Sequence, residues 1–207
     1  MRYIILFGTA FLLGILFAFL EISEPFGLII ALLITFILGF YLFVFPIHME
    51  KNVEKLEKFI EKRRKNPIFK LYYGIGNRID QDVKEATDIL LKKYKQPARQ
   101  ALFKTLFALY EKDILRAKDD VEEIKPPEYK RYYQAVIATE EGNIEKAEAL
   151  VKEIKSEWMR HALLAGIAEK NNDQNSFKEH IQKAFEKTRG LQRYIIYKQY
   201  EMYLKSR

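Results

Sequence analysis

The segment Pro127-Glu-Tyr-Lys-Arg-Tyr-Tyr133 begins a unit of 30 residues that recurs along most of the chain. Similar segments begin one and two periods earlier, at Pro97 and Pro67. One period after Pro127, Glu157 holds the equivalent position. Proline suits the first turn of a helix, because its fixed φ fits the helix and its missing N–H would have no partner there. Each of these positions therefore predicts the start of a helix.

The second half of each unit predicts a second helix. Its apolar positions are spaced i, i+4 and i+7, which places them on one helix face. In chain order they are Thr87, Leu91, Tyr94, Ala117, Val121, Ile124, Ala147, Val151, Ile154, Phe177, Ile181 and Ala184. The polar segments between the two halves are Asp80-Gln-Asp82, Glu111-Lys-Asp113, Glu141-Gly-Asn143 and Asn171-Asn-Asp173. Each unit is thus predicted to be a helix, a tight turn and a helix.

Stacking of these units predicts an all-α fold. A unit of this size cannot bury its apolar face alone, so we expect a short α-solenoid of about four helix-turn-helix repeats. The helical-repeat domain is expected to span residues 67–207, with Gly190–Arg207 as a C-terminal capping helix. Tyrosines recur in that helix at i+3 steps. They are expected to pack the cap, and a binding stripe is the alternative.

The third unit resembles a tetratricopeptide-like (TPR-like) repeat. Its sequence is Tyr132-Tyr-Gln-Ala-Val-Ile-Ala-Thr-Glu-Glu-Gly-Asn-Ile-Glu-Lys-Ala-Glu-Ala-Leu-Val-Lys-Glu-Ile154. Ala135 and Ala147 are similar to the small residues of the family's two helices, and Gly142-Asn143 is similar to its turn. The likeness covers residues 67–188 in outline, with a period of 30 where the family has about 34.

The resemblance implies that the chain binds a protein or peptide in a groove lined by the first helices of the pairs. The implied groove residues are Arg99, Leu102, Leu106, Tyr129, Tyr132, Val136 and Met159. Aromatic residues and arginine are enriched at the energetic centres of protein interfaces. The alternative is that several of these residues form core between helices. Arg131 and Gln134 stand where the family prefers Trp and Leu.

Two uncharged apolar runs, residues 3–20 and 26–47, precede the units. At about 1.5 Å per residue each run is long enough for a helix across a bilayer core of about 30 Å. We therefore expect residues 1–47 to form a two-helix transmembrane hairpin with the turn Glu21–Pro25. A signal peptide fits the first run less well, because no small-x-small cleavage site follows it.

Basic residues predict the orientation of this hairpin. The turn carries acidic residues but no Lys or Arg, whereas the segment after the second run is basic, and basic flanks stay in the cytoplasm. We expect an integral protein of the cell (inner or plasma) membrane, with both termini and the repeat domain in the cytoplasm. The residues expected to contact anionic lipid headgroups are Lys51, Lys55, Lys58, Lys62, Arg63, Arg64 and Lys65.

Residues 48–66 are expected to form a basic juxtamembrane helix that continues the second membrane helix as a solvated stalk. A stretch that lies on lipid or pairs with itself is the alternative. Small residues recur every four positions in both apolar runs and allow close helix packing in lipid. They are Ala10, Gly14, Ala18, Gly27, Ala31, Thr35 and Gly39. Packing within the hairpin is the main expectation, and homo-oligomerisation is the alternative.

The chemical content of the sequence favours a binding protein over an enzyme. The chain has no cysteine and no catalytic motif, and its three histidines are scattered, so we expect neither metal nor cofactor. The net charge is +7, and residues 51–65 beside the membrane carry +4 of it. Nucleic acid is therefore not the expected partner, although an RNA-binding solenoid is an alternative. The expected function is a membrane-anchored, cytoplasm-facing scaffold or adaptor.

Overall fold

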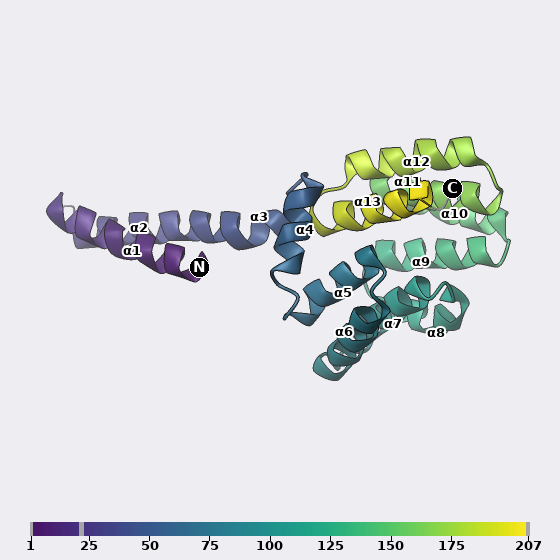
Figure 1. The fold of residues 1–207 in the computed structure, drawn as a ribbon, viewed down its shortest axis with the longest axis horizontal. Coiled ribbons are helices and arrows are strands. Elements are labelled where there is room, and N and C mark those ends of the chain that lie inside the picture. Colours follow the sequence, from purple (N-terminus) through teal and green to yellow (C-terminus); the bar gives the residue numbers. More distant parts are fainter. Residues whose placement is uncertain (1, 21–22, 206–207) are drawn as a thin grey trace.

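The structure, a computed structural model, describes residues 2–20 and 23–205, and every regular element within them is a helix. The prediction of an all-helical fold is confirmed. Figure 1 shows a rod of long helices that projects from a rounded body of packed helices. The rod contains the N-terminal quarter of the chain, and the body contains the rest.

Two neighbouring helices build the rod. The elements are α1 (Arg2–Phe19), α2 (Glu24–Gly39), η1 (Phe40–Val44) and α3 (Phe45–His48). Helix α1 contacts α2 and runs beside it in the opposite direction (Figure 1). The predicted turn Glu21–Pro25 includes residues 21 and 22, which lie outside the described residues.

One helix of the rod is long and apolar enough to cross a membrane. It is the continuous helix Pro25–His48, whose 24 residues extend about 36 Å and are not buried by the rest of the chain. Proline at position 46 cannot donate to the carbonyl four residues earlier. The turn before it is π-helical, and the amide of Phe45 donates to Phe40 instead, so the helix continues without a break. The apolar part of α1, Phe7–Phe19, is shorter.

The body begins with α4, and its helices α5, α7, α9, α11 and α13 start at Pro67, Pro97, Pro127, Glu157 and Gly190. Their bounds are α4 (Val53–Glu61), α5 (Pro67–Asn77), α6 (Asp80–Lys93), α7 (Pro97–Tyr110), η2 (Ile114–Ala117), α8 (Lys118–Glu122), α9 (Pro127–Glu140), α10 (Ile144–Glu153), α11 (Glu157–Lys170), α12 (Gln174–Lys187) and α13 (Gly190–Lys205). Side-chain caps support several starts, since the side chains of Asn66, Asn143 and Asp173 accept backbone N–H groups of the following turn.

The first helix pair turns earlier than the sequence predicts. In the later pairs the left-handed residues are Lys112, Gly142 and Asn172, inside or next to the predicted polar segments. In the first pair it is Arg78, and Asp80 already begins α6. Carboxylates in the first turn of a helix interact favourably with its N–H groups, so Asp80-Gln-Asp82 suits a helix start better than a break.

The second helices bury most of the predicted apolar positions, but in the first unit Leu91 and Tyr94 are half-buried and Leu90 is buried instead. Thr87, Ala117, Ala147 and Phe177, which share one position in the units, are each at most 7% exposed. The second helix of the second unit differs in form, because it is divided into the short 3-10 segment η2 and the five-residue α8.

The terminal helix α13 runs back across the body instead of covering only its last pair. It packs against α12 and also against α3, α4 and α5, far away in the sequence. Figure 1 shows it between α12 and α9, with its first turn beside the end of the rod. The chain therefore closes on itself, because its last helix contacts the helices that begin the body.

Helix α4 is packed into the body and is not a free stalk. It crosses the end of the rod at a steep angle (Figure 1). Leu56, Phe59 and Ile60 share one face of α4, are at most 5% exposed, and pack against Leu191 and Tyr194 of α13. The expectation of a solvated stalk differs from the structure because α13, distant in sequence, covers the apolar face that a stalk would expose.

Candidate functional site

A cavity of about 170 Å³ lies between the first helices of the pairs and α13. We call it the aromatic cavity. Its lining residues are Leu71, Tyr72, Ile75, Arg78, Leu106, Leu109, Tyr110, Tyr129, Tyr132, Tyr133, Trp158, Gln192, Ile195, Ile196, Gln199 and Met202. The lining thus combines contributions from α5, α7, α9, α11 and α13, so the first helix of each pair and the last helix share one cavity.

Aromatic rings form much of one wall. The ring of Tyr132 lies edge-on to that of Tyr133, with centroids 5.2 Å apart, and 6.0 Å from that of Trp158. Tyr132 and Tyr133 also pack into the clusters of buried apolar side chains between the pairs. These contacts hold the rings in place, so the wall has a defined shape without a ligand.

The tyrosine hydroxyls of this wall stay protonated. Burial raises the pKa of Tyr72 and of Tyr132 to about 12, with a smaller contribution from the neighbouring Tyr129. Burial also raises the pKa of Tyr133 well above its ordinary value. These hydroxyls can therefore donate or accept hydrogen bonds, but they are poor candidates for a nucleophile or a general base near neutral pH.

The start of α13 is anchored on the end of the rod. The amide of Gly190 donates to the carbonyl of Glu50 at 2.8 Å, and the Arg193 guanidinium donates from Nε to the carbonyl of Lys51 at 2.7 Å. Gly190 has φ +57°, and a Cβ atom there would collide with the carbonyl oxygen of Ile47. Only glycine fits this approach, because it lacks the Cβ and tolerates left-handed backbone.

Farther along α13, a polar network holds the helix on α5 and α4. Tyr194 is fully buried, and its hydroxyl accepts a 2.8 Å hydrogen bond from the side-chain amide of Asn77. Lys198 donates to the Asn77 side-chain oxygen at 3.1 Å and pairs with Glu57 at 2.8 Å. At Gly76, a Cβ atom would lie 2.7 Å from the Tyr194 ring. The network thus fixes the α13 wall of the cavity.

Arg78 and Tyr110 form one end of the cavity, near the C-termini of α5 and α7. The Arg78 guanidinium lies 4.9 Å from the centroid of the Tyr110 ring and donates to the Tyr110 carbonyl at 3.1 Å. Its Nε also contacts the sulfur of Met202 on α13 at 3.3 Å. The Tyr110 hydroxyl donates to Asp80. Burial is the larger cause, and this hydrogen bond the second, of a rise in the pKa of Tyr110 to about 12.

The structure brings together only part of the groove implied by the TPR-like resemblance. Leu106, Tyr129 and Tyr132 line the aromatic cavity. Met159 is 2% exposed and belongs to the core. The others lie outside the cavity lining: Leu102 and Val136 are half-buried between helices, and Arg99 is exposed over the ring of Tyr94.

Several lining residues were not predicted from the sequence, because the cavity crosses the helices obliquely. Arg78 and Tyr110 lie at the ends of α5 and α7, whereas Trp158 lies in the first turn of α11. The groove residues implied by the TPR-like resemblance occupy the same places in successive units. Such a set cannot follow an oblique cavity. The residues from α13 depend on a long-range contact that no local pattern indicates.

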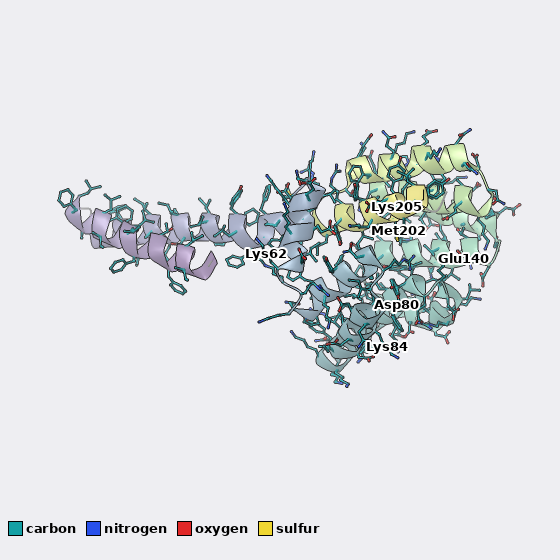
Figure 2. The ribbon with its side chains drawn as sticks, in the orientation of Figure 1. Lys62, Asp80, Lys84, Glu140, Met202 and Lys205 are labelled. Carbon is teal, nitrogen blue, oxygen red and sulfur yellow. The ribbon has the colours of Figure 1, made fainter. Side chains whose placement is uncertain are left out.

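The expected headgroup residues fall into two groups. Lys51, Lys55, Lys58, Lys62 and Lys65 are exposed, and Figure 2 shows Lys62 on the side of the body from which the rod projects. The two arginines instead contact the body. Arg63 lies 3.8 Å from the centroid of the Phe59 ring, and Arg64 pairs with Asp82 and lies 4.6 Å from the centroid of the Tyr73 ring.

The small residues of the rod also divide into two groups. On α2, Gly27 is buried, and Ala31, Thr35 and Gly39 are half-buried, on the helix that packs against α1. On α1, Ala10 is half-buried, but Gly14 and Ala18 are exposed. The small-residue face of α1 is therefore only partly covered by its contact with α2.

Two half-buried histidines that are distant in sequence contact each other. His161 of α11 and His180 of α12 place their Nδ1 atoms 3.2 Å apart, with stacked rings. Burial, and then the charge of His180, lowers the pKa of His161. Among the described residues, no group of three or more His, Cys, Asp or Glu side chains could hold a metal ion.

No protein-family model, curated protein or solved structure matches this chain. The TPR-like resemblance of the third unit therefore stays a prediction from its residues.

Proposed function

We propose that this chain is a membrane-anchored adaptor that binds a protein or peptide partner at the aromatic cavity and holds it close to the bilayer. The observation that carries this proposal is the meeting of Tyr, Trp and Arg side chains from four helix pairs in one cavity. These residue types dominate the binding energy of protein interfaces. A partner would insert one side chain into the aromatic cavity, beside Arg78.

A two-helix transmembrane hairpin is the proposed anchor. The helix Pro25–His48 has the length and apolar character to span a bilayer, and α1 packs beside it. The basic residues that follow favour a cytoplasmic body with both termini on that side. The exposed lysines of α4 would then lie near anionic headgroups, where each contributes about 1 kcal/mol of attraction.

A TPR-like solenoid is the proposed architecture of the body. Supporting it, the helices α5, α7, α9 and α11 begin one repeat apart, at Pro67, Pro97, Pro127 and Glu157. Each is followed by a turn and a second helical segment. The contact of α13 with α4 and α5 would close this solenoid, so that its inner face becomes a bounded cavity.

Ion pairing on the body favours a protein partner over RNA. Many of its lysines already pair with carboxylates of neighbouring elements, which reduces the positive surface open to a phosphate backbone. Such pairs are Lys104–Asp120, Lys118–Glu141, Lys130–Glu122, Lys170–Glu140 and Lys187–Glu157.

A second candidate function is homo-oligomeric assembly in the membrane. The observation that favours it is the exposure of Gly14 and Ala18 on α1, where a Cβ atom on Gly14 would meet no neighbour within 4 Å. Such a face allows close approach of a second copy in lipid.

Site-directed photocrosslinking in native membranes tests the adaptor proposal. A photoreactive amino acid at Gln199, which is exposed and lines the cavity, should capture a discrete protein partner. The matched control places the same group at Lys152, which is exposed on α10 and outside the cavity lining. Tyr132→Ala should reduce the capture at Gln199. Identical products from both sites, or capture of RNA alone, would contradict the proposal.

A further inference from the structure

We propose that the aromatic cavity is also a small-molecule site that takes one benzene-sized carboxylic acid. This goes beyond the adaptor function, because the acid would occupy the space into which the partner inserts a side chain. The two ligands would therefore compete. The inference rests on the size of the cavity, the chemistry of its wall and the single charge at its end.

The size of the cavity matches one aromatic ring. Its volume is about 170 Å³, and an apolar protein cavity of about 150 Å³ accommodates benzene. Helix α13 bounds the cavity on one side, through Gln192, Ile195, Ile196, Gln199 and Met202. A compact ring fits within this volume.

The wall presents surfaces that favour an aromatic ring. The lining combines the apolar side chains of Ile75, Leu106 and Leu109 with aromatic side chains that include Tyr132 and Trp158. A ring between them can pack edge-to-face or offset against its neighbours, the arrangements that aromatic groups prefer. Tyrosine hydroxyls at the wall add hydrogen-bonding groups that a carboxylate can use.

The charge of the cavity favours an acid over a base. Arg78 is the one charged side chain among the described residues that line it, and the lining contains no carboxylate. Within the described residues, Arg78 takes part in no ion pair. The nearby Asp80 accepts the Tyr110 hydroxyl and begins α6 outside the cavity lining.

Within the described residues, the guanidinium of Arg78 is held in position by contacts that use only part of its N–H groups. Its Nε points to the Met202 sulfur and one Nη1 hydrogen to the Tyr110 carbonyl. A guanidinium carries five N–H groups, so the remaining ones can bind a carboxylate as a charge-assisted pair. The ring would then lie among the aromatic side chains and the carboxylate beside Arg78.

Trp158 provides a direct readout, because it is the one tryptophan in the sequence and lines the cavity. The probe is 4-bromobenzoate, whose bromine quenches tryptophan fluorescence on contact, titrated into the full chain in lipid nanodiscs. We expect saturable quenching that unbrominated benzoate reverses. Bromobenzene and 4-bromobenzylamine, matched in size but neutral or cationic, should bind about tenfold more weakly.

Two variants and one control test the assignment of the residues. Arg78→Gln should weaken 4-bromobenzoate binding about tenfold and leave bromobenzene unchanged, since a hydrogen bond to a charged group is lost. Ile195→Phe should weaken all three probes by narrowing the cavity. Arg131→Gln changes an arginine outside the cavity lining and should leave every probe unaffected. Circular dichroism verifies the folding of each variant.

Several outcomes would overturn this inference. They are quenching that rises linearly without saturation, equal affinity for the acid and the cation, or unchanged acid binding in Arg78→Gln. The adaptor proposal fails separately, if no partner is captured at Gln199 while the acid still binds. A captured partner together with no acid binding would leave the adaptor function standing and remove the small-molecule site.

Discussion

The backbone amide of Gly190 donates a 2.8 Å hydrogen bond to the carbonyl oxygen of Glu50. This bond joins the first residue of α13 to the segment that leaves the rod, across most of the chain length. Arg193 adds a second bond to the same segment through the Lys51 carbonyl. The aromatic cavity is therefore connected to the proposed membrane anchor through α13, which forms one wall of the cavity and contacts α3.

Replacing Gly190 with alanine should destabilise this junction strongly. The residue has a positive φ, and the new Cβ would collide with the Ile47 carbonyl, so we expect a loss of at least about 2 kcal/mol in the free energy of unfolding. Chemical denaturation of the full chain in mild detergent, followed by circular dichroism, measures it. Gly142→Ala is the control, because it has φ +77° but no neighbour within 4 Å. Equal losses in both variants would contradict the contact at Ile47.

Tyr194→Phe should cost about 1 kcal/mol of stability. The substitution keeps the buried ring against Gly76 but removes the hydroxyl that accepts the Asn77 amide. The cost stays modest because that amide also donates to the Tyr73 carbonyl at 3.1 Å. Thermal unfolding measures the change, with Tyr197→Phe on the same helix as the comparison. A neutral Tyr194→Phe would argue that the hydroxyl bond contributes nothing.

Arg64→Ala should destabilise the body by about 1–2 kcal/mol, whereas Lys65→Ala should change it by less than about 0.5 kcal/mol. Asp82 is 7% exposed, and loss of Arg64 leaves it with Lys70 at 3.7 Å as its remaining ion-pair partner. Lys65 is exposed. Denaturation midpoints of the two variants provide the comparison. The opposite ranking would show that the Arg64–Asp82 pair does not stabilise the body.

The free energy of unfolding should fall as the pH drops below about 6.5, because His161 of the histidine pair becomes protonated less readily in the folded chain than in the unfolded chain. Burial and the charge of His180 lower the pKa of His161 in the folded chain from its ordinary value of 6.5. A group whose folded pKa is depressed stabilises the fold above its unfolded pKa, and that stability is lost as the pH falls through the folded pKa. Melting temperatures at about pH 7.5 and about pH 5.5 should differ less in His161→Gln than in the unmodified chain. An unchanged difference would remove the pair from this pH dependence.

We expect Gly14→Leu to reduce self-association in the membrane, as the second candidate function predicts. The leucine fits the hairpin, because a Cβ at Gly14 meets nothing within 4 Å, but it blocks close approach of another copy. Chemical crosslinking in membranes measures the fraction of dimer. Phe11→Leu, also on the exposed part of α1, is the control. An unchanged dimer fraction in Gly14→Leu would place any association elsewhere.

Local features account for the parts of the fold that the sequence predicted. Proline at a first turn and a polar segment at a turn act over a few residues, so the starts of α7 and α9 follow from Pro97 and Pro127. The histidine pair shows the opposite case. His161 and His180 are 19 residues apart, with no local pattern that relates them, and only the packing of α11 on α12 brings them together.

The sequence by itself determined the helical character, the apolar helix Pro25–His48 and the faces that become buried. These depend on backbone preference, length and periodicity, which act within a turn or a segment. Only the tertiary structure decided that α13 returns to α4 and α5, and hence where Arg78 and Trp158 meet in one cavity. The physical reason is that this return depends on shape. Gly76 leaves room for the Tyr194 ring, and Gly190 leaves room for the backbone of the rod at Ile47. Such complementarity is not expressed in the periodicity of the sequence.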